Sequence, residues 1–163
     1  MARTDREPNI VPSLLDRLID EAPGVSQEAV PKRSQTVRQF ERAVARDLEA
    51  MLNTRRETLE DLPEEFEEVR RSLLNYGLPD FTSYSLLGPK DKARVIRALE
   101  ETIASFERRL DRVRVTLEEP RAHERAMRFR VDALLRVDPT PEPVTFDTVL
   151  QLTTQEYRVQ GHG

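Results

Sequence analysis

The spacing of apolar residues changes once along this chain, from a helical period to a period of two, near residue 110. Upstream, apolar side chains recur at intervals of three and four, as they do in amphipathic helices. Downstream, they alternate with polar side chains, as in strands that have one buried and one solvated face. We therefore predict an α+β fold, in which N-terminal helices pack on one face of a small antiparallel sheet of three to four strands.

Three helices are predicted within the main body of the chain. One covers residues 34–53, one runs from Pro63 to about Leu74, and one opens after Gly88 with Pro89 in its first turn. The segment 75–79 contains a glycine and two residues later a proline, so it should stop the helix before it. The apolar stripes of the two longer helices are Val37, Phe40, Val44, Leu48, Met51 and Leu52, and Ala93, Ile96, Leu99, Ile103 and Phe106.

A further short helix is predicted near the N-terminus, over residues 13–21, with Ser13 as its N-cap. A helix of this length is marginal alone, so its apolar side chains should pack on something. Residues 22–33 hold two prolines and a glycine and are typical of a linker. We therefore predict an N-terminal arm over residues 1–33 and a domain over residues 34–160. The apolar residues of the short helix are Leu14, Leu15, Leu18 and Ile19.

Three strands follow from the alternation, and a proline-rich turn at 139–143 separates the last two. Tyr157 and Val159 should add a short fourth strand or an edge. The residues expected on the buried face are Val113, Val115 and Leu117, then Phe129, Val131, Ala133, Leu135 and Val137, and then Val144, Phe146, Thr148, Leu150 and Leu152.

The charge and cysteine content narrow the possible partners and compartment. The net charge is -4, and the basic residues are mixed with acidic ones rather than gathered in a stripe, which argues against nucleic-acid binding. Cysteine is absent, which fits a reducing compartment. No signal peptide is evident, and no apolar run approaches the roughly 20 residues that span a bilayer. We expect a cytoplasmic protein without direct membrane insertion.

The residues that usually carry catalysis are sparse. Of the two histidines, His162 lies in the C-terminal tail and His123 lies in a predicted polar turn, where we interpret it as a solvated loop residue. The five glycines form no phosphate-binding loop, and the chain lacks a zinc ligand set. We predict no cofactor, no metal and no small-molecule substrate.

Glu107 is the best candidate for a catalytic acid, because it lies between apolar residues where the last helix gives way to the first strand. A glycosidase needs a second carboxyl group roughly 5–10 Å away, and Asp111 or Asp132 could supply it. The competing interpretation is an ion pair of Glu107 with Arg108, Arg109 or another arginine. With 26 Lys and Arg residues in the chain, the ion pair is favoured.

Three stretches, in this order, carry a resemblance to a known family: RDLEAMLNTR at 46–55, SLLNYGLPDF at 72–81 and VDPTPEPVTFDT at 137–148. Together they resemble the TssE-type baseplate subunits of type VI secretion, members of a phage baseplate-wedge family once described as lysozyme-like. The resemblance runs from about Ser13 to Val159. It implies a non-catalytic structural protein at the rim of a baseplate wedge, at the inner face of the inner membrane.

The resemblance also implies partners. Family members sit with the wedge subunits TssF, TssG and TssK and seed a contractile sheath of TssB and TssC. The sheath contact is expected to be strand exchange, in which backbone groups of a sheet edge bond to a partner strand. We expect that edge at residues 145–154, with Tyr157 and Val159 beyond. The candidate partner-binding residues there are Phe146, Thr148, Leu150, Leu152 and Tyr157.

The family carries a Glu-Pro-Arg motif before its first strand, and the matching positions are Glu107, Arg108 and Arg109. The resemblance implies a partner-binding role for all three. Arg108 departs from the motif, because proline would end the helix and stiffen the turn. We expect Glu107→Ala to abolish assembly and leave the isolated fold intact. Three alternatives stay open: a baseplate component of a phage tail or other contractile injection system, a peptidoglycan-cleaving enzyme, and an unrelated helical adaptor.

Overall fold

The computed structural model describes residues 10–19, 36–57, 66–70, 72–81, 88–119, 126–152 and 154–161, and it confirms the α+β class. The helical elements are α1 (Leu14–Leu18), α2 (Val37–Leu52), α3 (Glu67–Arg70), the 3-10 turn η1 (Leu73–Asn75) and α4 (Pro89–Phe106). The strands are β1 (Leu110–Leu117), β2 (Ala126–Leu135), β3 (Glu142–Gln151) and β4 (Tyr157–Gly161).

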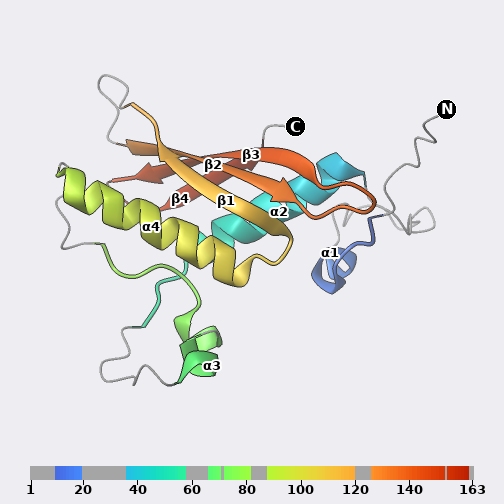
Figure 1. Cartoon of the computed structure of the whole chain (residues 1–163), viewed down its shortest axis with the longest axis horizontal. Coiled ribbons are helices and arrows are strands. Elements are labelled where there is room, and N and C mark those ends of the chain that lie inside the picture. Colours follow the sequence, from blue (N-terminus) through green and yellow to red (C-terminus); the bar gives the residue numbers. More distant parts are fainter. Residues whose placement is uncertain are drawn as a thin grey trace.

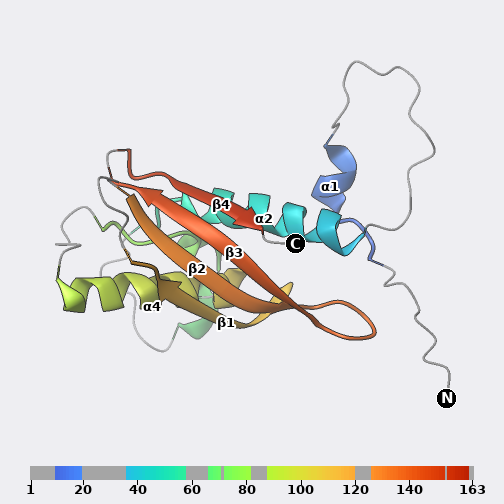
Figure 2. The same ribbon diagram turned by 90° about the horizontal axis from the view of Figure 1, so that it is seen from above.

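The four strands form one antiparallel meander, in the order β1-β2-β3-β4 (Figure 1). Helices α2 and α4 both lie on one face of this sheet, while α3 and η1 stand away from it (Figures 1 and 2). The short fourth strand expected at Tyr157 and Val159 is confirmed.

The core lies between the sheet and the two long helices. The predicted stripe of α2 is confirmed, with Val37 partly buried and the other five residues buried. On α4 the prediction was wrong at Ala93, which is exposed, because the buried stripe begins two residues later at Val95. The strands contribute alternate residues to the core: Leu110, Val115, Phe129, Val131, Ala133, Leu135, Val144, Phe146, Leu150, Tyr157 and Val159.

The sheet edge is not where the sequence placed it. Strand β3 is an interior strand, because the chain turns back after Gln151 and β4 pairs with it from Phe146↔Gly161 to Leu150↔Tyr157. The prediction that residues 145–154 form the edge was therefore wrong. Tyr157 and Val159, which the same prediction placed beyond that stretch, do lie on an edge strand, because the edge strands are β1 and β4. Leu152 was expected on the buried face, but it lies beyond the end of β3 and is 40% exposed.

Near the N-terminus, Ser13 is the N-cap of α1 as predicted. Its hydroxyl accepts a hydrogen bond from the backbone N–H of Asp16, and the Asp16 carboxylate accepts one from the backbone N–H of Ser13. Upstream, Ile10 is buried in the core, so the arm is anchored to the domain. The predicted helix start at Pro63, the linker 22–33 and His123 lie outside the described residues.

The apolar side chains of α1 do not pack as expected on the part of the chain that the structure describes. Leu14 is 73% exposed and Leu18 is 74% exposed, and Val11, Leu15 and Ile19 are also exposed. The helix lies beside α2, outside the sheet (Figure 2). Its outer surface is therefore apolar and uncovered by any described residue.

The predicted stop at 75–79 is confirmed and has a tertiary role. Gly77 has φ +98, and a Cβ at this position would lie 2.2 Å from the backbone oxygen of Thr54. The next residue, Leu78, donates its N–H to the Thr54 oxygen at 2.9 Å and accepts from the N–H of Arg56 at 2.7 Å. Glycine therefore lets this loop run beside the exit of α2.

Candidate functional site

The residues that match the family motif lie where α4 ends and β1 begins. Glu107 is the C-cap residue of α4, and its backbone N–H donates to the oxygen of Ile103 at 2.9 Å. Its side chain is buried, although it is a carboxylate. A buried charge has to be paired and hydrogen-bonded to be tolerated.

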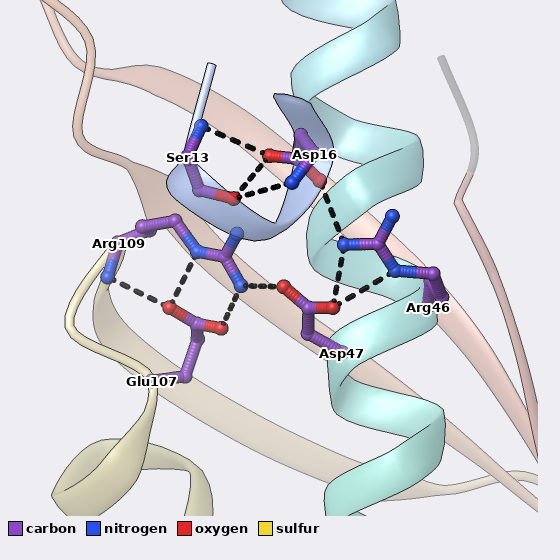
Figure 3. Close-up of polar contacts among 6 residues, drawn as sticks. All are labelled: Ser13, Asp16, Arg46, Asp47, Glu107 and Arg109. Carbon is purple, nitrogen blue, oxygen red and sulfur yellow. Dashed lines mark hydrogen bonds and ion pairs between the residues drawn. The ribbon is translucent and has the colours of Figure 1, made fainter. Parts of the chain in front are cut away.

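Arg109 provides that pairing. Its Nε donates to Oε1 of Glu107 at 2.8 Å, and its Nη2 donates to Oε2 (Figure 3). The backbone N–H of Arg109 also donates to Oε1, at 3.0 Å. This is a bidentate guanidinium–carboxylate pair, closed within three residues of chain. The ion pair that the sequence favoured for Glu107 is confirmed, and its partner is Arg109.

The pair continues into a line of charges that joins three elements. Nη2 of Arg109 also donates to Oδ2 of Asp47 on α2, at 2.7 Å. The other oxygen of Asp47 accepts from Nε and Nη2 of Arg46, and Nη2 of Arg46 reaches Oδ1 of Asp16 on α1 at 2.7 Å (Figure 3). We call Asp16, Arg46, Asp47, Glu107 and Arg109 the charged junction.

Sequence reasoning missed the contribution of Asp16, Arg46 and Asp47. Arg46 and Asp47 open the stretch at 46–55 that carries the resemblance, but adjacent residues on a helix are not expected to pair with each other. Their pairing with residues from α1 and from the α4–β1 turn depends on how the elements pack. No local signal in the sequence could have identified it.

The electrostatics keep Arg109 and Asp16 ionised. Burial acts to lower the pKa of Arg109, but hydrogen bonds to Glu107 and Asp47 outweigh it and raise that pKa above its ordinary value. Burial acts to raise the pKa of Asp16, but hydrogen bonds from Ser13 and Arg46 outweigh it and lower that pKa below its ordinary value. Both groups therefore remain charged at neutral pH.

Aromatic residues lie close to the charged junction. The Cζ atom of Arg109 lies 5.9 Å from the centre of the Phe40 ring, within range of a cation–π interaction. Tyr76 packs edge-on against Phe106, with ring centres 5.3 Å apart. Burial raises the pKa of Tyr76, and the charges of Asp47 and Glu107 add to this effect.

The arrangement around Glu107 does not suit general acid catalysis. Both of its carboxylate oxygens accept hydrogen bonds from Arg109, so neither oxygen is free to contact a substrate. A small cavity of about 90 Å³ lies elsewhere, between the exit of α2 and the β3–β4 hairpin. Within the described ranges, no three His, Asp or Glu side chains are grouped to hold a metal ion.

The other predicted site residues lie apart from the contacts of the charged junction. Arg108 is exposed, next to the buried Glu107. On β3 the side chains of Phe146, Thr148 and Leu150 are buried, so they face the helices. Tyr157 on β4 is buried too, while Leu152 is exposed; both line the small cavity, together with Leu150.

Comparison with known families identifies the chain. The family model for baseplate wedge protein gp25 matches residues 38–140, well over half of the 163 residues. The matched range holds α2, the loop at 72–81, the α4–β1 turn and the first two strands, and thus all of the charged junction except Asp16. Searches among curated proteins and among solved structures give no match. In the described part, no helix is both long enough and apolar enough to cross a bilayer. The chain belongs to the baseplate wedge protein gp25 family and is a structural component of a contractile injection system.

Proposed function

We propose that this chain is the TssE-type subunit of a type VI secretion baseplate, which joins wedge subunits and nucleates the contractile sheath. The observation that carries the proposal is the Glu107–Arg109 pair, which occupies the first and last positions of the motif that the TssE-type sequences carry before their first strand. The residues of the stretches at 72–81 and 137–148 favour a subunit of a secretion system over a subunit of a phage tail. The chain would work at the cytoplasmic face of the inner membrane, without inserting into it.

The charged junction has two roles in this proposal: it fixes the turn between α4 and β1, and it presents arginine side chains to a partner. Glu107 and Arg109 bond mainly to each other and to Asp47, so their first effect is to fix the turn between α4 and β1. That turn presents Arg108, which is exposed, and Arg109, whose side chain is 22% exposed. The partner-binding role would therefore fall on the exposed Arg108 and the partly exposed Arg109, the second of which is held in place by the buried carboxylate.

The N-terminal arm over residues 1–33 would provide a second contact with a partner, in addition to the contact made by the domain at 34–160. Asp16 ties α1 to α2 through Arg46, while the leucines of α1 point outward. Large apolar side chains grouped on a surface are typical of a protein that works inside an assembly. The proposed partners are TssF, TssG and TssK on the wedge side, and TssB and TssC on the sheath side. An edge strand, β4 rather than β3, would make the sheath contact.

Affinity purification of the tagged chain from its own host under mild conditions tests this proposal, with the co-purifying proteins identified by mass spectrometry. Recovery of TssF and TssG, or of the sheath proteins, is expected. Recovery of phage-tail structural proteins instead would assign the chain to another contractile machine. Failure to recover any wedge or sheath subunit would contradict both the assignment to type VI secretion and the assignment to another contractile machine.

A charge reversal at Arg108 tests the site. Arg108→Glu should reduce recovery of the wedge subunits and leave the fold unchanged, because this side chain is exposed. The matched control is Arg97→Glu, which reverses an exposed arginine on α4. Equal recovery with both variants would remove Arg108 from the interface.

A further inference from the structure

The charged junction is a line of charges that alternate in sign. Followed from α1 to the turn between α4 and β1, its members are an acid, a base, an acid, a base and an acid, and each neighbouring pair forms an ion pair (Figure 3). The carboxylates at its two ends are the most buried, with side chains 5% exposed at Asp16 and 9% exposed at Glu107. Among the described residues, no hydrogen bond joins α1 directly to that turn, so the line through α2 is their polar connection.

Asp47 lies at the centre of this line and holds both arginines. Its Oδ1 accepts from Nε of Arg46 at 3.0 Å and from Nη2 at 2.8 Å, and its Oδ2 accepts from Nη2 of Arg109 at 2.7 Å. The two oxygens belong to one planar group, so a rotation of the carboxylate that follows one guanidinium weakens its bonds to the other. The two arginines therefore cannot reorient independently.

A single nitrogen of each arginine makes the connection outward from Asp47. Nη2 of Arg46 donates both to Asp47 and to Asp16. Nη2 of Arg109 likewise donates both to Asp47 and to Glu107. A terminal guanidinium nitrogen carries two hydrogens, so each of these atoms has both of its hydrogens in use. Loss of Asp47 as an acceptor would free one hydrogen on each atom and leave each arginine with a carboxylate on one side alone.

The charge of Asp47 also keeps the two arginines close together. In each case burial acts to lower the pKa of the guanidinium, but hydrogen bonds to two carboxylates outweigh it and raise that pKa, and Asp47 is one of the two carboxylates for both arginines. Without that charge, Arg46 and Arg109 would be like charges with no anion between them, and like charges repel. The position of each guanidinium thus depends on the carboxylate that it shares with the other.

We propose that Asp47 is a positioning residue that couples the docking of α1 to the orientation of Arg109, so that a change at one end of the charged junction alters the other end. When α1 leaves α2, Arg46 loses its outer carboxylate and is free to turn, and Asp47 turns with it. Arg109 then keeps its bonds to Glu107 alone. Equilibrium coupling between two sites is reciprocal, so a partner that draws Arg109 away from Asp47 would in turn loosen α1. The coupling belongs to the isolated chain, and only the nature of that partner rests on the proposed function.

Arg109→Lys cuts the line at the turn without touching α1. Lysine keeps a positive charge beside Glu107 but lacks the planar group that bonds two carboxylates at once. Asp16→Asn cuts the line at the other end. The matched control is Arg136→Lys, the same change in a pair of similar geometry. Arg136 donates to both oxygens of Asp111 through Nε and Nη2, at 2.6 Å each, and neither residue belongs to the charged junction.

Amide hydrogen exchange of the purified chain, measured by millisecond pulse labelling, reports on both ends of the line. At α1 the reporters are the hydrogen-bonded amides of Arg17 and Ile19, and at the turn the reporter is the hydrogen-bonded amide of Arg109. Arg109→Lys should speed exchange at α1 about fivefold, at the lower end of the range for coupled sites. Asp16→Asn should speed exchange of the Arg109 amide by about the same factor, because the coupling is reciprocal. Arg136→Lys should leave both ends as in wild type.

A double variant separates coupling from a general loss of stability. In the Asp16→Asn background, Arg109→Lys should add nothing at α1, because the line is already cut, whereas two independent losses would multiply. Wild-type exchange at α1 in Arg109→Lys or at the turn in Asp16→Asn, or a further rise at α1 in the double variant, would overturn the proposal. If Arg109→Lys does not fold, Asp47→Asn takes its place in both comparisons, since it removes the central charge and leaves the residues at both ends unchanged. None of these outcomes depends on the recovery of wedge subunits, so this proposal and the proposed function can fail independently.

Discussion

Arg109 binds the carboxylate of Glu107, two residues before it, through Nε and Nη2, and the same Nη2 reaches Asp47 on α2. One guanidinium therefore closes a tight turn and joins it to a helix 62 positions earlier in the chain. The motif residues that the resemblance linked to partner binding thus have a structural role inside the subunit. Substitution of these residues should therefore change the stability of the isolated protein as well as partner binding.

Glu107→Ala should destabilise the isolated protein, in contrast to the expectation from sequence that the fold stays intact. Removing one member of a buried ion pair leaves the other uncompensated, at a cost of roughly 3–5 kcal/mol. Because Arg109 keeps its hydrogen bond to Asp47 and its side chain is 22% exposed, we expect a cost at or below the lower end of that range. Urea denaturation measures the free energy of unfolding, with the exposed Glu101→Ala as control. A loss no larger than that of the control would contradict the structural role of the pair.

Acid should release α1 from α2 only below the ordinary pKa of an aspartate. The pKa of Asp16 in the folded state is lowered from 3.8, so its ionised contacts add stability that is fully present above 3.8. That contribution is lost as the pH falls through the lower folded-state pKa. The protection of the α1 amides, measured as their exchange relative to the intrinsic rate at each pH, should fall in this window. Asp16→Asn should show fast exchange of the α1 amides already at neutral pH. Protection equal to wild type in that variant would contradict the role of Asp16 in holding α1 against α2.

Gly77→Ala should cost about 2–3 kcal/mol, because the residue would be held at positive φ with its Cβ against the Thr54 carbonyl. The strain would also weaken the backbone bonds of Leu78 to Thr54 and Arg56. Gly88→Ala is the matched control, since Gly88 has φ -80 and alanine at this N-cap of α4 should cost only about 0.5–1 kcal/mol. Thermal unfolding of both variants compares them, and similar melting temperatures would argue against the close approach at Gly77.

Glu41→Gln should stabilise the isolated protein by about 1 kcal/mol at neutral pH. The buried Oε1 of Glu41 has no hydrogen-bond partner among the described residues, and a neutral amide is less costly to bury there than a carboxylate. Urea denaturation of the variant beside wild type measures the change. Glu49→Gln, at a carboxylate that does accept a hydrogen bond from Val159, should not gain stability. A lower stability of Glu41→Gln would mean that this carboxylate is paired in solution.

Much of the fold could be predicted because its signals are local. Apolar spacing placed α2, α4 and the strands, the hydroxyl of Ser13 marked the start of α1, and Gly77 marked a turn. The error at Ala93 had a tertiary cause: this residue fits a helical stripe in the sequence, but the way α4 lies on the sheet gives that place to Val95. At the site, the ion pair of Glu107 with Arg109 could be foreseen because only one residue separates the two in the sequence.

The sequence by itself determined the elements, their class and the identity of the motif residues, since periodicity and capping act over a few residues. Only the tertiary structure decided which strand is the edge, that Asp47 completes the charged junction, and that Asn53 bonds to the backbone of Tyr157 in β4 from 104 positions away. These features depend on strand order and on the packing of α2 against the sheet. Contacts between distant residues leave no periodic trace in the chain, so they had to be seen in three dimensions.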